Sequence, residues 1–301
     1  MTEGIVDWPE ELVSSIIDNR CIMFIGAGVS NSIKFKKGER IPTWHLFLKI
    51  ALEKLKSESA NKVKKLIEME QYLDALEIIK NIMDPAEYTK LLKDNYTCLI
   101  NNIQYPGALS VIFNLNLPVI ISTNFDTTYE DYCISNTVNK AYSIFNYDKT
   151  KEIVETLKSS ESLIIKAHGS IREPDHIIFT KSEYYEFMRN RPEFFEILKA
   201  LFMTRTVLFV GYSLNDPDIN ILLNSVNSIG LMSYSKPHYI LLAETERDDY
   251  KLNHWKNNFN VRPVFYEKGK NSSYENFVPA LVRLHAQVMS KIDFQRGPTP
   301  L

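Results

Sequence analysis

Six short apolar segments, separated by stretches with helical spacing, constrain the fold of this chain most strongly. Each is four or five residues long and is rich in β-branched or aromatic side chains. They occupy residues 21–25, 119–122, 162–166, 206–210, 238–242 and 261–265. Because these segments are nearly continuous in apolar residues, both faces of each strand are expected to be covered, as in a parallel sheet between helices. The pattern predicts a doubly wound α/β fold.

The long stretch between the first two strands predicts a helical insertion. The first clear helix starts near Thr43, and apolar residues then recur at spacings of three and four from about residue 61 to residue 102. We interpret residues 31–102 as an inserted, mainly helical layer or small domain, which part of residues 140–205 can join. Residues 10–30 and 103–301 would form a Rossmann-like domain. A chain of 301 residues is long enough for this arrangement.

The composition excludes several classes of protein. With 45% hydrophobic and 24% charged residues the chain is an ordinary globular one. A net charge of −2 provides no broad basic face, so nucleic acid is not expected as a direct ligand. No segment reaches the ~18 apolar residues of a membrane span. Cys21, Cys98 and Cys133 are far apart and form no CxxC pair, which disfavours disulfides and a zinc site. We predict a cytoplasmic protein without a metal.

Four of the predicted strands end in glycines or polar residues. In parallel α/β sheets, ligands bind at the carboxyl ends of the strands. The four segments run from Gly26 to Ser30, from Ser122 to Asp126, from Ala167 to Ser170 and from Gly211 to Asp218. We therefore expect a ligand site where these ends meet.

The first of these segments suits a phosphate group. Gly26, Ala27 and Gly28 let the backbone approach a pyrophosphate and present amides to it, with Ser30 as a further donor. The alternative is a tight turn at the strand exit without a ligand. A dehydrogenase fingerprint would have a third glycine at position 31, where this chain has Asn31, so hydride transfer is disfavoured.

The next two segments carry groups that can do chemistry. Asn124 and Asp126 can bond to ribose hydroxyls, water or a carboxamide, although both are also good caps for the helix predicted at 127–134. His168, next to Gly169, can take a proton from water or a ribose hydroxyl. An isolated histidine, however, is more often structural.

The fourth segment suits contact with adenosine or a phosphate. It begins at Gly211 and opens a helix predicted from Ile219 to Val226. The alternative is a turn followed by an acidic helix start, because Asp216, Pro217 and Asp218 favour helix initiation whatever the loop binds.

Taken together and in this order, the four segments resemble the sirtuin superfamily. The similar residues are Gly26 to Ser30, Thr123 to Asp126, His168 with Gly169, and Gly211 to Leu214. The resemblance spans roughly residues 10–265. It is closest to the sirtuin-like NADase domains of bacterial antiphage defence, such as the Thoeris effector and defence-associated sirtuins.

The resemblance implies an enzyme that takes NAD⁺ as its substrate and needs no metal. Such an NAD⁺ glycohydrolase cleaves the nicotinamide–ribose bond to give nicotinamide and ADP-ribose, and it would deplete NAD in antiphage defence. Asn124 and His168 would be catalytic. The residues implied to bind NAD are Gly26, Ala27, Gly28, Ser30, Thr123, Asp126, Gly211 and Ser213.

This chain differs from the sirtuins that act as deacylases, and the differences favour water over acyl-lysine as the group that attacks the ribose carbon. The zinc module's two CxxC pairs are missing, Thr123 replaces a glutamine, and residues 172–180 replace the peptide groove. An NAD-dependent deacylase and a catalytically silent NAD or ADP-ribose sensor remain alternatives, and so does cyclisation of the product. Because an unregulated NADase would deplete its own cell, we expect a homo-oligomer or a regulatory partner, such as a phage-sensing subunit or an ATPase.

Overall fold

A parallel sheet forms the centre of the molecule. The computed structural model describes residues 6–36, 38, 40–137, 141–212, 220–221, 223–224, 236–270, 272 and 274–296. The strands of this sheet are β1 (Cys21–Ile25), β4 (Val119–Ser122), β5 (Tyr142–Asn146), β6 (Ser162–Lys166), β7 (Thr206–Val210), β8 (His238–Ala243) and β9 (Val261–Tyr266). The seven lie in the order β5-β6-β4-β1-β7-β8-β9, and every neighbouring pair is parallel. The predicted Rossmann-like sheet is confirmed.

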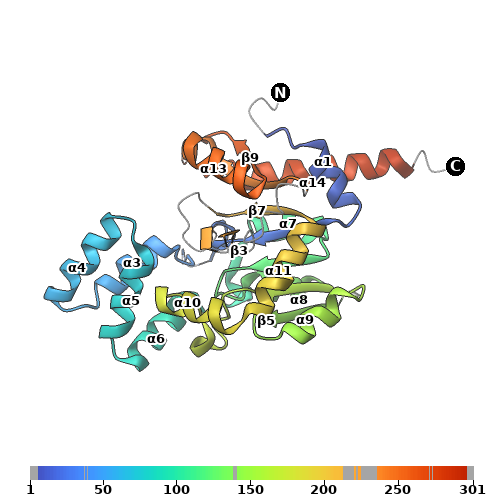
Figure 1. The fold of residues 1–301 in the computed structure, drawn as a ribbon. Coiled ribbons are helices and arrows are strands. Elements are labelled where there is room, and N and C mark those ends of the chain that lie inside the picture. The colour runs from blue at the N-terminus through green and yellow to red at the C-terminus, as the bar shows by residue number, and fades with distance from the viewer. Residues whose placement is uncertain are drawn as a thin grey trace.

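Helices cover both faces of the sheet (Figure 1). One face carries α1 (Glu10–Ile17), α7 (Ala108–Leu115), α8 (Thr128–Asn136) and α14 (Phe277–Arg296), and the other carries α9 (Thr150–Leu157), α11 (Pro192–Thr204) and α13 (Asp249–Phe259). In β1, Cys21, Met23 and Ile25 belong to one core cluster, whereas Ile22 and Phe24 belong to the other. Side chains alternate between the faces of a strand, so a strand between two helical layers must be apolar throughout.

Three strands were missed by the sequence analysis. β5 is a half-buried strand at the edge of the sheet, and its mixture of polar and apolar residues matches neither the apolar pattern nor strict alternation. The other two, β2 (Lys34–Phe35) and β3 (Ile103–Tyr105), form an antiparallel pair that is too short to show any periodicity.

The segment between β2 and β3 is helical, as predicted. It contains α3 (Trp44–Leu52), α4 (Ser57–Glu68), α5 (Tyr72–Ile82) and α6 (Pro85–Tyr96), followed by the short helix η1 (Ile100–Asn102). Figure 1 shows α3 to α6 grouped to one side of the sheet. Helix α10 (Lys181–Asn190) meets α5 through an ion pair of 2.9 Å between Lys181 and Asp74. The domain boundaries at residues 31 and 102 stay a prediction.

The order of the strands places a topological switch point at β1. From β1 the chain moves to β4 on one side, and it later returns to β7 on the other side. The carboxyl ends of these three strands therefore meet around a crevice of the kind that binds ligands in doubly wound folds. A short helix, α2 (Ala27–Asn31), begins directly after β1. Within the described ranges, no helix is long and apolar enough to cross a membrane.

Candidate active site

The turns that follow β1 and β7 pack directly against each other. The Gly28 amide donates to the Gly211 carbonyl at 2.9 Å, and the Gly26 amide donates to Val210 at 2.9 Å. A Cβ on Gly28 would lie 2.8 Å from the Gly211 Cα, and Gly211 itself has a φ of +77°. The glycines are therefore required for contact between two backbones. Because the Gly26 and Gly28 amides already donate to protein carbonyls, they differ from the ligand-facing amides expected from the sequence.

Asn124 is held by both of the hydrogens on its amide nitrogen. Its Nδ2 lies 3.0 Å from the Gly26 carbonyl oxygen and 3.0 Å from Ser30 Oγ. Ser30 Oγ donates in turn to Asp126 Oδ2 at 2.8 Å. Since the amide hydrogens are engaged, Asn124 can offer a ligand its Oδ1, which is an acceptor.

Asp126 combines two roles that the sequence left as alternatives. Its Oδ1 accepts a hydrogen bond of 3.1 Å from the Thr128 amide at the start of α8 and another from the Thr128 hydroxyl. Its Oδ2 meanwhile belongs to the cluster with Ser30. The carboxylate thus satisfies a free amide at the helix start and remains part of the site.

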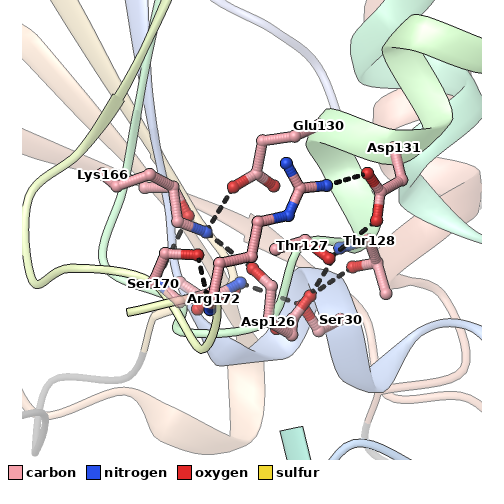
Figure 2. Close-up of polar contacts among 12 residues, drawn as sticks. Ser30, Asp126, Thr127, Thr128, Glu130, Asp131, Lys166, Ser170 and Arg172 are labelled. Atoms are coloured by element: carbon pink, nitrogen blue, oxygen red, sulfur yellow. Dashed lines mark hydrogen bonds and ion pairs between the residues drawn. The ribbon is translucent and has the colours of Figure 1, made fainter. Parts of the chain in front are cut away.

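A buried ion pair between Lys166 and Glu130 lies next to Asp126 (Figure 2). Lys166 Nζ is 2.5 Å from Glu130 Oε1 and 2.6 Å from the main-chain oxygen of Asp126. The two side chains are only 2% and 3% exposed. Burial raises the pKa of Glu130, and the charge of Lys166 opposes that rise. Sequence reasoning missed this pair, although a lysine that ends an otherwise apolar strand was an available signal.

Thr123 joins the exits of β4 and β7. Its Oγ1 lies 2.8 Å from the hydroxyl of Tyr212, which also donates to the carbonyl of Ile25 at 3.3 Å. Ser213, the next residue, lies outside the described residues, as does half of the helix predicted from Ile219 to Val226. The role predicted for Ser213 stays a prediction.

Two hollows meet at these strand ends. A cavity of about 1340 Å³ lies beside Gly28 and Gly211 and extends towards α3, α5 and the segment after β8. A recess of about 20 Å³ adjoins it, and Ala27 and Trp44 line both hollows. The polar residues that line the recess are Ser30, Thr123, Asn124 and Asp126. Roughly 10–15 Å³ is enough for one water molecule, so the recess has room for a single water beside these polar residues.

His168 lies apart from Asn124. It is 1% exposed and lines neither hollow, as far as the described residues show. Its ring nitrogens lie 3.2 and 3.4 Å from the hydroxyl of Tyr184 on α10. Burial lowers the pKa of His168 to about 3, which keeps the imidazole neutral at physiological pH. The structure therefore assembles the glycines, Ser30, Thr123, Asn124 and Asp126, whereas His168 contacts Tyr184 instead.

Acid is expected to destabilise the fold through His168 and His238. Burial lowers their pKa values to about 3 and about 4, from the ordinary 6.5 of an exposed histidine. Below pH 6.5 the two histidines bind protons in the unfolded chain but stay neutral in the folded chain. The free energy of unfolding therefore decreases as the pH falls towards 4. Going from pH 7 to pH 5 should cost about 2 kcal/mol per histidine. Urea denaturation of wild type and His168→Gln measures this, and equal pH dependence in the two proteins would contradict it.

No cluster of three or more His, Cys, Asp or Glu side chains suited to a metal ion occurs in the described part of the chain. Cys21 and Cys133 are buried, and Cys98 is partly buried. The groups that the site offers are an amide, hydroxyls and carboxylates.

A parallel sheet with a cavity at its switch point is the arrangement in which doubly wound α/β proteins bind their ligands. Residues 118–264 of this chain match the family model described as a SIR2-like domain. The resemblance predicted from the four strand ends is confirmed.

Three relatives are similar to this chain. Defense-associated sirtuin 2 of Bacillus subtilis is 24% identical over 261 residues, which are 85% of this chain and 24% of that protein. NAD(+) hydrolase ThsA of Acinetobacter baumannii (strain 532279) is 29% identical over 131 residues, or 43% of this chain and 27% of the relative. ThsA of Cytobacillus dafuensis is 24% identical over 241 residues, with coverage of 80% and 44%. The chain thus spans less than half the length of each of these relatives.

Proposed function

We propose that this chain hydrolyses NAD⁺ at the nicotinamide–ribose bond and acts as an NAD-depleting effector in antiphage defence. The observation that carries the proposal is the recess of about 20 Å³ beside Asn124, which adjoins the large cavity along Ala27 and Trp44. One water fits the recess while a dinucleotide occupies the cavity. Relatives that bear the name NAD(+) hydrolase support the same reaction.

The groups around the recess suit this chemistry. When the bond to nicotinamide breaks, nicotinamide leaves as a neutral molecule and positive charge develops on the ribose. The carboxylate of Asp126 stabilises that charge, and Asn124 Oδ1 accepts a hydrogen bond from the attacking water and orients it. The water forms the new bond to the ribose carbon and gives up a proton, which we assign to His168. Gly26, Ala27, Gly28 and Gly211, with Ser213, remain the proposed contacts of the ADP portion.

The burial of His168 favours a second candidate function, a silent module that binds NAD or ADP-ribose. A histidine that lines neither hollow and has a pKa of about 3 is a weak base until substrate binding exposes it. Under this alternative, NAD⁺ binds without turnover. A deacylase would instead direct an acyl oxygen at the ribose carbon, so its nicotinamide release would require an acylated peptide.

Incubating the purified chain with NAD⁺ tests these three functions together. Chromatography follows nicotinamide and ADP-ribose with and without an acetyl-lysine peptide, and calorimetry measures NAD⁺ binding in parallel. We expect equal amounts of both products without peptide. Release that depends on peptide would identify a deacylase, and binding without products would identify the silent module. His168→Ala is expected to bind NAD⁺ and to abolish turnover.

We further propose that the activity is controlled by assembly. An NADase without control would deplete its own cell, so a homo-oligomer or a regulatory partner, such as a phage-sensing subunit or an ATPase, would hold it in check. The cytoplasm is the proposed compartment. Light scattering of the purified chain is expected to give a mass that is a multiple of the single chain, and activity should follow the assembled fraction.

A further inference from the structure

We propose that Lys166 and Glu130 are positioning residues that hold the turn from Asn124 to Asp126 in its reactive geometry. The inference rests on the proposed hydrolysis of NAD⁺ at this turn. Neither residue lines the recess or the cavity, as far as the described residues show, so both would act through the turn rather than on the substrate.

Hydrogen bonds link the ion pair through Asp126 and Ser30 to Asn124. Figure 2 shows Lys166, Asp126 and Ser30 of this series. Lys166 Nζ donates to the main-chain oxygen of Asp126 at 2.6 Å. The carboxylate of Asp126 accepts from Ser30 Oγ at 2.8 Å, and Ser30 Oγ accepts from Asn124 Nδ2 at 3.0 Å. Lys166 therefore fixes the backbone of the turn at Asp126. The bonds from Asp126 to Ser30 and from Ser30 to Asn124 then hold the Asn124 amide in place.

The placement of the charges argues against a purely packing role. The three residues that precede Lys166 in β6 are apolar and buried, and Lys166 itself is 1% exposed. Burying an ion pair costs desolvation that apolar residues of similar size avoid, so such a pair is weak support for stability alone. What an apolar pair could not supply is the donor to the Asp126 carbonyl. Glu130 then serves as the counter-charge that allows a lysine to be buried there.

A second ion pair between the same parts of the chain provides a matched control. Arg172, soon after β6, lies 2.5 Å from Asp131 on α8, with side chains 57% and 25% exposed. Exposed pairs of this kind contribute little to stability. Arg172→Ala removes an ion pair next to Lys166 and Glu130 but leaves the Asp126 carbonyl with its donor.

The test compares the double variant Lys166→Met/Glu130→Leu with Arg172→Ala. Replacing both charges by apolar groups should leave the Tm within a few degrees of wild type and the Kd for NAD⁺ within about twofold. We expect kcat to fall by about 10-fold or more, because displacing a reacting group by about 1 Å can cost 10²-fold. Hydrogen exchange of residues 123–128 should become faster in the double variant and stay unchanged in Arg172→Ala, which keeps wild-type kcat.

The outcomes separate this proposal from the function on which it rests. A folded double variant with wild-type kcat and unchanged exchange at 123–128 would overturn the positioning role. A wild-type protein without NAD⁺ turnover would refute the proposed function, whereas the exchange measurement would still decide the positioning role. Lys166→Arg keeps a cation beside Glu130, so it tests the proposal if the double variant does not fold. We expect Lys166→Arg to keep the wild-type rate of hydrogen exchange at residues 123–128. Exchange as fast as in an unfolded turn would refute the positioning role of Lys166.

Discussion

Replacing Asn124 by alanine is expected to reduce NAD⁺ cleavage by about 10²–10³-fold, the usual loss when one preorganised polar group of a reaction centre is removed. The substitution deletes the Oδ1 acceptor at the recess and the two donors that bind Gly26 and Ser30. Single-turnover measurement of nicotinamide release gives the effect on the chemical step. Calorimetry should show that NAD⁺ still binds, because the large cavity is lined by other residues.

Asn136→Ala is the matched control for this variant. Asn136 is an exposed residue at the end of α8, and its side chain donates to the Tyr132 carbonyl in the preceding turn. Its replacement should leave turnover unchanged. If Asn124→Ala retained half of the wild-type rate while its circular dichroism and Tm were normal, Asn124 would have no part in the reaction.

Replacing Gly211 by alanine is expected to destabilise the protein by about 3 kcal/mol or more. The left-handed conformation alone costs an alanine roughly 1–2 kcal/mol, and Gly211 has a φ of +77°. The added Cβ would also lie 2.6 Å from the Val29 amide nitrogen and 3.0 Å from the Gly26 carbonyl oxygen, both of which belong to backbone. The turns after β1 and β7 would have to separate. Urea denaturation measures the loss.

Gly38→Ala separates the two causes of this effect. Gly38 has a φ of +72°, but a Cβ built there meets no atom of the described residues within 4 Å. It should therefore cost about 1 kcal/mol, from the backbone conformation alone. Equal losses in the Gly38 and Gly211 variants would mean that close packing of the two turns contributes nothing.

The sheet could be predicted where the strands are buried on both faces. β1 is a continuous apolar segment because each of its five residues enters one of the two cores, and the same holds for the three central residues of β6 and the last four of β7. β5 was not predicted because it is a half-exposed edge strand, and such a strand need not be apolar at every residue. β2 and β3 were missed because two or three residues cannot show a period.

The sequence by itself determined the kinds of group that stand at the strand ends, because the end of a strand and the residue after it are local properties. It thereby indicated Gly26, Asn124, His168 and Gly211, together with the resemblance to sirtuins.

Only the tertiary structure decided which of these groups meet. Ser30 and Asp126 are 96 residues apart in sequence yet bonded to each other, because β1 and β4 are neighbours in the sheet. His168 follows a strand that is not adjacent to β1, and its ring turns towards Tyr184 in the core rather than lining the recess. Lys166 and Glu130 form a pair only after β6 and α8 have come together. Such contacts depend on the order of the strands, which local periodicity does not encode.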